Sequence, residues 1–275
     1  MQRWWHMILT HSVFVSICAG ALCVQSYHLM NLPVHWPLCL AVSCFTLAGY
    51  NVYWLISKFH FSSQSMPQVL LQQPAHGAFF FMGTSAGTAL IVSYPVTFPW
   101  LLITAAIGGM YALPLLLSIS GTRLRVPGAV KTVLLAVVWT IATVMVPLAD
   151  IDDASALIPL LLIRFSFIFM LNIIFDVGDA ANDRQLNLRT LATDSSSITL
   201  YRWMAVSIGI YTTAIVYSVW HFLPVLTGVV LWSMVLPVAM LFRKAFSKQS
   251  YHFYYLYTDG LMLCSAVATY LAGIV

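Results

Sequence analysis

The segment ALIPLLLIRFSFIFMLNIIFDVGDAANDR, residues 156–184, decides the fold class. It begins with a long apolar run, and a membrane-spanning helix needs roughly 20 mostly apolar residues. The run ends in Asp176, Asp179 and Asp183, although the whole chain has only eight acidic residues and no glutamate. Ionisable groups beside a membrane segment are costly and commonly functional. The segment therefore predicts a membrane helix with a functional site at its end.

The rest of the chain has the composition of a polytopic membrane protein. Of its 275 residues, 61% are hydrophobic and 7% are charged, and the mean hydropathy is +0.89. These values lie outside the range of soluble globular domains. We predict an all-α fold in one transmembrane domain, residues 1–275, with about nine spans. The predicted spans are residues 8–30, 34–57, 78–95, 98–119, 127–148, 155–177, 199–219, 222–242 and 255–275.

The distribution of lysine and arginine predicts the orientation in the membrane. Basic residues concentrate in alternate loops, and such loops usually face the cytoplasm. We therefore expect a protein of the cytoplasmic (inner) membrane, with the N-terminus inside and the aspartates at the cytoplasmic face. The net charge of +4 would attract an anionic substrate or anionic membrane lipid to that face. No basic and aromatic run is long enough to suggest nucleic-acid binding.

Helical periodicity places the three aspartates on one face. Asp176 and Asp179 are three residues apart, Asp179 and Asp183 are four apart, and Asn172 lies one turn before Asp176. Two like charges 4 Å apart repel by about 4 kcal/mol at an effective dielectric constant near 20. This stripe of oxygen-bearing side chains therefore needs positive charge nearby.

Three sources of positive charge are open. Arg184 and Arg189 are close in sequence and could form salt bridges at a solvated helix end. Protons could neutralise the carboxylates in a transporter relay. A hard divalent cation is the third source, and oxygen ligands suit Mg²⁺, which is usually held by one or two carboxylates together with phosphate. The third hypothesis predicts a phosphorylated substrate.

The residues also carry a resemblance to a known family. The run FDVGDAANDRQLNLRTLAT, residues 175–193, resembles the second aspartate-rich motif of the UbiA superfamily of intramembrane prenyltransferases. That motif has the pattern Asp-x-x-Asp-x-x-x-Asp followed by a Thr-Leu pair. Four further stretches occur in matching order: GYN at 49–51, YALPLLL at 111–117, RLRVPGAVKT at 123–132 and YYLYTDGLML at 254–263.

The resemblance implies both a fold and a reaction. Members of the family are similar in having nine helices around a central cavity that opens laterally to lipid. They use Mg²⁺ to hold a polyprenyl diphosphate, whose isoprenoid chain passes to a lipophilic acceptor, often an aromatic ring or quinone precursor. By carry-over, Asp176, Asp179 and Asp183 would be catalytic metal ligands. Seven other residues are predicted to bind substrate: Asn51, Lys58, Arg123, Arg125, Lys131, Asn172 and Asp259.

These predicted substrate-binding residues have different expected roles. Arg123, Arg125 and Lys131 would contact the diphosphate, and Asn172 would either orient the aspartates or bond to another helix. Asp259 would join the mouth of the cavity, or instead pair with Arg164.

The first aspartate-rich motif of the family is degenerate in this chain. It usually reads Asn-Asp-x-x-Asp, whereas the matching residues here are NVYWL at 51–55, and no acidic residue occurs between Met1 and Ala149. Lys58, seven residues after Asn51, could meet a phosphate in place of a metal. Two outcomes are open: an enzyme with an altered site, or a non-catalytic protein that keeps the cavity to bind an isoprenoid lipid or a protein partner.

A hypothesis from another class is a small proton-coupled transporter, with a relay through Asp176, Asp179 and Asp259. Two related halves, or glycine-broken helices in equivalent positions, would favour it. The sequence contains no such pair.

Overall fold

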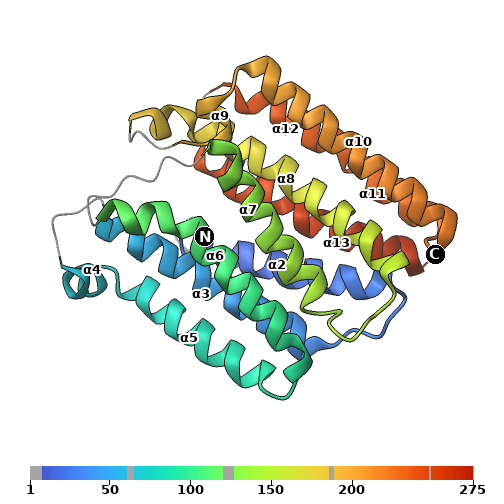
Figure 1. The fold of residues 1–275 in the computed structure, drawn as a ribbon, viewed down its shortest axis with the longest axis horizontal. Coiled ribbons are helices and arrows are strands. Elements are labelled where there is room, and N and C mark those ends of the chain that lie inside the picture. The colour runs from blue at the N-terminus through green and yellow to red at the C-terminus, as the bar shows by residue number, and fades with distance from the viewer. Residues whose placement is uncertain (1–7, 61–64, 120–126, 186–188, 248, 275) are drawn as a thin grey trace.

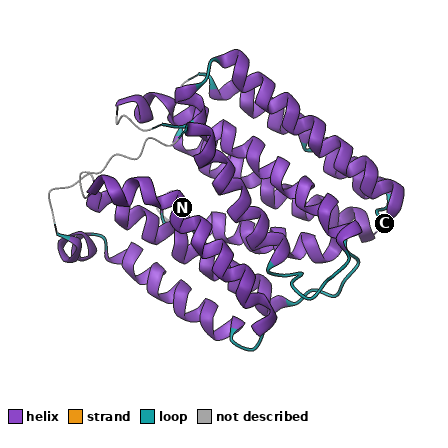
Figure 2. Ribbon diagram, viewed as in Figure 1, coloured by secondary structure: helices purple, strands orange, loops and turns teal. Residues whose placement is uncertain are grey.

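A computed structural model describes residues 8–60, 65–119, 127–185, 189–247 and 249–274 (Figure 1). The described chain is all-helical, with 86% helix and no strand in these residues (Figure 2). The predicted all-α class is therefore confirmed.

Each predicted span overlaps one helix or two consecutive helices. The α-helices are α2 (Val13–Leu29), α3 (Trp36–His60), α4 (Met66–Gln72), α5 (Pro74–Ile91), α6 (Phe98–Ile119), α7 (Gly128–Thr140), α8 (Ala154–Gln185), α9 (Leu191–Asp194), α10 (Ser197–His221), α11 (Val225–Ser233), α12 (Val235–Ala245) and α13 (Asp259–Ile274). A 3₁₀ turn, η1 (Pro95–Thr97), precedes α6, and two π-helical segments, η2 (Ile141–Met145) and η3 (Phe253–Thr258), follow α7 and precede α13.

Six segments of the described chain are long and apolar enough to cross a membrane. They are Trp36–Phe59, Pro95–Ala112, Gly128–Met145, Ala154–Ala181, Ser197–His221 and Val225–Ala245. Helix α2 is apolar but shorter, and α5 and α13 also fall outside this set. The six segments are consistent with an integral membrane protein. The count of nine spans, the central cavity and the orientation in the membrane stay predictions.

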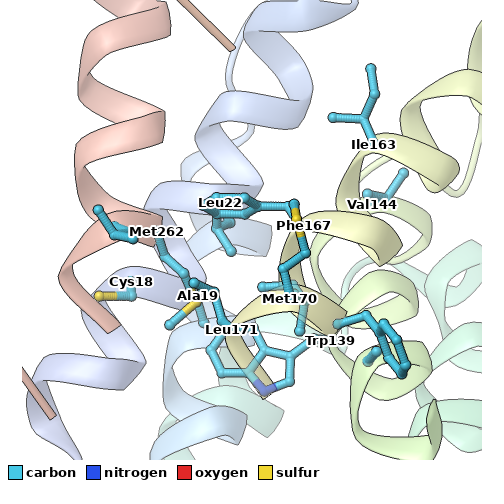
Figure 3. Packing of buried hydrophobic residues seen from close by; sticks show 14 of the residues in the cluster. Cys18, Ala19, Leu22, Trp139, Val144, Ile163, Phe167, Met170, Leu171 and Met262 are labelled. Carbon is cyan, nitrogen blue, oxygen red and sulfur yellow. The ribbon is translucent and has the colours of Figure 1, made fainter. Parts of the chain in front are cut away.

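Helix α8 is the central helix of the described fold. In its most apolar window 78% of the residues are buried, against at most 39% in the other five segments. It packs against α7, α10 and α12 (Figure 1). Its apolar side chains meet those of α2, α7 and α13 in a close-packed core (Figure 3). The long apolar run before Asp176 is therefore buried by protein on most sides. The aspartates follow this run at the C-terminal end of the same helix.

Arg164 connects α8 to α2 inside this core. Only 3% of its surface is exposed, and its guanidinium donates to Gln25 Oε1 at 2.9 Å, to the Leu22 carbonyl at 2.9 Å and to Ser26 Oγ at 3.1 Å. Gln25 in turn donates to two hydroxyls of α13, at 3.0 and 3.1 Å. The alternative that Arg164 pairs with Asp259 was therefore wrong, because neutral acceptors of α2 hold the cation.

The network predicts that replacing Gln25 by leucine destabilises the fold by about 2–3 kcal/mol, because hydrogen bonds to charged groups contribute more than neutral ones. The change leaves Arg164 buried without one of its acceptors. Replacing a whole buried polar set by apolar residues is often tolerated, so the double variant Gln25→Leu, Arg164→Leu should recover most of the loss. Thermal unfolding of both variants in detergent tests this. Additive losses in the double variant would contradict it.

Candidate active site

The three aspartates continue the register of α8, which is helical without interruption from Ala154 to Gln185. Asp176 is half-buried, Asp179 is exposed and Asp183 is buried with 7% of its surface exposed. A helix rises 1.5 Å per residue, so the first and third carboxylates start about 10 Å apart along the axis. A single ion can therefore be bound directly by Asp176 with Asp179, or by Asp179 with Asp183, but not by all three.

Helix α7 lies against this stripe and supplies polar contacts. Thr132 Oγ1 donates to Asp176 Oδ2 at 2.6 Å, and Asn172 Nδ2 donates to the Thr132 carbonyl at 3.3 Å. The positive charge of Lys131 acts on all three aspartates. Lys131 Nζ also lies 5.4 Å from the centroid of the Tyr111 ring on α6. Asn172 thus bonds to another helix, which is the second of its two expected roles, and Lys131 is within electrostatic reach of the aspartates. The predicted roles of both residues in substrate binding stay predictions.

Aromatic side chains from several helices lie near the residues of the aspartate stripe. Tyr111, which is near Lys131, has its ring 5.6 Å from that of Tyr53 on α3. Phe175, the residue before Asp176, packs against two tyrosines of η3, Tyr254 and Tyr255, at 5.8 and 5.9 Å. Trp139 Nε1 of α7 donates to Tyr50 Oη of α3 at 3.3 Å.

Two features of this site were missed by the analysis of the sequence. The first is the hydroxyl of Thr132, and the second is the close approach of Tyr254 to α8. A Cβ atom at Gly178 would overlap the Tyr254 ring, so glycine makes room for it. The sequence contained one indication of this close approach. It is the glycine between Asp176 and Asp179, considered together with the tyrosine-rich stretch at 254–257.

Asp259 begins α13 directly after η3 and is 7% exposed. Its main-chain carbonyl accepts a hydrogen bond from the Cys18 thiol at 3.5 Å. Its charge acts on Tyr50 and on Tyr255, and the charge of Asp179 also acts on Tyr255. Asp259 is therefore close to the aromatic side chains of the site.

The two predicted substrate residues of α3 lie in different surroundings. Asn51 is fully buried, where its amide donates to the carbonyls of His11 and Leu47 at 3.0 and 2.8 Å, and its Oδ1 lies 2.7 Å from His76 Nδ1. Lys58 is exposed. Arg123 and Arg125 fall outside the described residues. The roles of all four residues, those of α3 and the two arginines, in substrate binding stay predictions.

The short helix α9 joins the two site helices at their ends. Asp194 Oδ2 accepts from the Gly128 backbone N–H at 2.8 Å, at the first residue of α7, and pairs with Arg189 at 2.9 Å. Thr190 caps α9, and its hydroxyl acts on the pKa of Asp183. Burial raises the pKa of Asp183, while the charge of Lys131 and the Thr190 hydroxyl oppose that rise. Arg189 thus bonds Asp194 and not the aspartate stripe.

Replacing Asp194 by alanine should cost about 1–2 kcal/mol of stability at neutral pH, because a buried N–H and an arginine lose their acceptor. The hydrogen bonds from Arg189 and Gly128 lower the pKa of Asp194 below its ordinary 3.8. A lowered pKa means that this stabilisation is complete above the ordinary value and is lost as the pH falls through the folded-state value. The difference from the wild type should therefore shrink below pH 3.8. Thermal unfolding across pH measures it, with Asp152→Ala as the control for an exposed aspartate.

The oxygen donors of the stripe suit Mg²⁺ in type, but they do not form a complete cage. Across the described residues, no group of three His, Cys, Asp or Glu side chains is close enough to hold a metal ion. A site with one or two carboxylates per ion, completed by water and phosphate, is the usual arrangement for Mg²⁺. The donor atoms are therefore of the type that Mg²⁺ prefers, and magnesium binding at this stripe stays a prediction.

Two pockets of the described chain lie away from this site. One, of about 290 Å³, lies between the ends of α2, α5 and η2 and is lined by residues that include His35, Tyr94 and Asp150. The other, of about 550 Å³, is an apolar groove between α8 and α10.

Comparison of the chain with protein-family models, with curated proteins and with solved structures finds no match in any of the three. The geometry of the site and the motifs of the sequence are therefore the basis for a functional conclusion.

Proposed function

We propose that this chain is an integral-membrane prenyltransferase of the UbiA type. It would transfer an isoprenoid chain from a polyprenyl diphosphate to a lipophilic acceptor with the help of Mg²⁺. The observation that carries the proposal is the juxtaposition of three aspartates on α8 with Lys131 of α7, beside aromatic rings from α3, α6 and η3. This arrangement combines ligands for a metal diphosphate with surfaces for an apolar chain.

In this proposal the aspartates would hold magnesium in adjacent pairs, Asp176 with Asp179 or Asp179 with Asp183. When bound, the metal supplies positive charge that stabilises the leaving diphosphate. Lys131 adds a fixed cation on the same side. Thr132 is a positioning residue, because its hydroxyl donates a hydrogen bond to one oxygen of Asp176 and so orients the carboxylate.

The reaction breaks the bond between the allylic carbon and the diphosphate oxygen, and the electron pair leaves with pyrophosphate. The acceptor forms the new bond to that carbon and then loses a proton. Aromatic faces attract cations, so Tyr53, Tyr111 and Tyr254 can stabilise the developing allylic cation. Their rings also exclude water, which would otherwise capture it.

A second candidate function is a non-catalytic protein of the same fold that binds an isoprenoid lipid or a protein partner. The specific observation in its favour is Asn51, at the position of the degenerate first motif. Its amide and carbonyl oxygen are engaged by His11, Leu47 and His76. That engagement leaves the first motif without a metal ligand from α3.

Binding and turnover of radiolabelled geranylgeranyl diphosphate by the purified protein in nanodiscs tests the proposal. We expect binding in the presence of magnesium, its loss with EDTA, and release of pyrophosphate when a lipophilic aromatic acceptor is added. Magnesium-dependent binding without pyrophosphate release would favour the non-catalytic alternative. Absence of diphosphate binding would exclude the prenyltransferase.

A further inference from the structure

The pocket of about 290 Å³ lies at the end of the helical bundle that is opposite the aspartate stripe. Its lining residues come from the connections between α2 and α3, between α5 and α6, and between η2 and α8, and from the helix ends beside them (Figure 1). Ile151 lines the pocket just before α8 begins at Ala154. From Ala154 to Asp176 the helix rises about 33 Å, at about 1.5 Å per residue. The pocket is therefore separate from the proposed diphosphate site.

Three aromatic rings from different parts of the chain meet in this pocket. The centroid of the His35 ring lies 5.5 Å from that of Tyr94 and 6.4 Å from that of Tyr27. Hydrogen bonds hold the surrounding chain. Tyr27 Oη donates to the Pro147 carbonyl at 2.6 Å, and the buried Thr97 donates through Oγ1 to the Tyr94 carbonyl at 2.7 Å. The pocket thus presents aromatic surfaces on a chain that is already held in place.

The charge of the pocket is negative. Asp150 lines it, and no lysine or arginine is present among the described residues that form its walls. The Asp150 side chain is exposed, and its charge acts on the hydroxyl of Tyr27, so the carboxylate is within electrostatic reach of the aromatic rings. The whole chain has a net charge of +4. The pocket therefore differs in sign from the rest of the molecule and favours a cation over an anion.

Aromatic rings together with one carboxylate favour an organic cation. Cations are attracted to the faces of aromatic rings, and quaternary ammonium groups are recognised by several rings at once. A metal ion such as Mg²⁺ or Ca²⁺ would instead need several oxygen ligands, and Asp150 is the one carboxylate of the pocket lining. The volume lies at the small end of the range for ligand pockets, which begins at about 300 Å³. It therefore suits a single head group and not a long chain.

We infer that this pocket binds an alkylammonium group. The rings of Tyr27, His35 and Tyr94 contact its alkyl carbons, and the carboxylate of Asp150 supplies the opposite charge. The inference is independent of the proposed prenyl transfer, because the pocket lies at the other end of α8. Two sources share this chemistry: a soluble amine such as choline, and the head group of a phospholipid such as phosphatidylcholine.

A matched pair of probes tests the inference on the protein in nanodiscs of phosphatidylglycerol and a neutral glycolipid, neither of which has an ammonium group. Labelled choline carries the cation, whereas 3,3-dimethylbutan-1-ol has carbon in place of the charged nitrogen. In equilibrium dialysis, corrected with empty nanodiscs, choline should bind the wild type about tenfold more tightly than the alcohol. Equal binding of the two probes to the wild type would overturn the inference, and this comparison needs no variant.

Three variants locate the binding. Asp150→Asn removes the charge of the pocket and Tyr94→Leu removes one ring, so each should lose most of the preference for choline. Asp152→Asn is the matched control, because Asp152 is also exposed and lies two residues further along the chain but does not line the pocket. It should bind choline like the wild type. Equal losses in Asp150→Asn and Asp152→Asn would show a general effect of charge and would overturn the inference.

The lipid composition of the nanodiscs distinguishes the two sources. In a second set of nanodiscs phosphatidylcholine replaces the neutral glycolipid, so the net charge of the bilayer stays the same. If the pocket takes a lipid head group, binding of free choline to the wild type should fall several-fold in these nanodiscs. If it takes a soluble amine, choline binding should be unchanged. Both results agree with an ammonium site, and each identifies a different source.

Discussion

Replacing Asp176 and Asp179 together by alanine is expected to lower magnesium-dependent binding of geranylgeranyl diphosphate by about 100-fold or more. Loss of even an indirect contact to a metal ligand commonly costs 10–100-fold in metal affinity, and this variant removes two proposed ligands. The measurement is binding of labelled diphosphate at a series of magnesium concentrations. The variant should behave as the wild type does in EDTA, because Asp183 alone cannot supply a pair of carboxylates.

The chain offers a control with the same loss of charge. Asp150 and Asp153 also lie three residues apart, but they precede α8 at its other end. The double variant Asp150→Ala, Asp153→Ala should bind magnesium and diphosphate like the wild type. Equal loss in both double variants would show a general effect of net charge. Unchanged binding in the Asp176 and Asp179 variant would exclude the stripe as the diphosphate site.

Replacing Gly128 by alanine is expected to destabilise the fold by about 3 kcal/mol, at the upper end of the usual range for overpacked positions. A Cβ atom there would overlap the backbone carbonyl of Thr190, and neither a helix N-terminus nor a capped turn can move like a flexible side chain. The shift would also break the 2.8 Å hydrogen bond from Gly128 to Asp194. Thermal unfolding and size-exclusion elution of the purified variant measure the effect.

Gly209→Ala is the matched control, because nothing lies within 4 Å of a Cβ atom at that position in α10. Alanine is favoured over glycine inside a helix by roughly 0.5–1 kcal/mol, so this variant should be at least as stable as the wild type. If Gly128→Ala were equally stable, α7 and α9 would not be in the close contact described.

Sequence alone predicted the helical segments well, because each apolar run is bounded by polar residues or by proline and glycine. The run before Asp176 illustrates this: a span predicted at 155–177 belongs to a helix that continues to Gln185. The number of spans was harder to predict. Helix α2 has 17 residues and is short for a membrane-spanning helix. Length and hydropathy by themselves do not decide whether such a helix crosses the membrane.

The candidate site was predictable where it lies on one helix and unpredictable where it joins several. Periodicity placed Asp176, Asp179 and Asp183 on one face of α8. It could not identify Thr132 as the partner of Asp176, since the two residues are 44 apart in sequence. For the same reason Arg164 could not be assigned to Gln25, 139 residues away.

The sequence by itself determined the helical class, the membrane character and the stripe of carboxylates at the end of α8, because these depend on composition and on the repeat of one helix. Only the tertiary structure decided which side chains meet that stripe. It brought Lys131 and Thr132 to the aspartates, left Asn51 in a separate hydrogen-bonded cluster and buried Asp259 at the start of α13. The physical reason is that contacts between helices depend on how their side chains pack at close approach, and hydropathy along the chain carries no information about that packing.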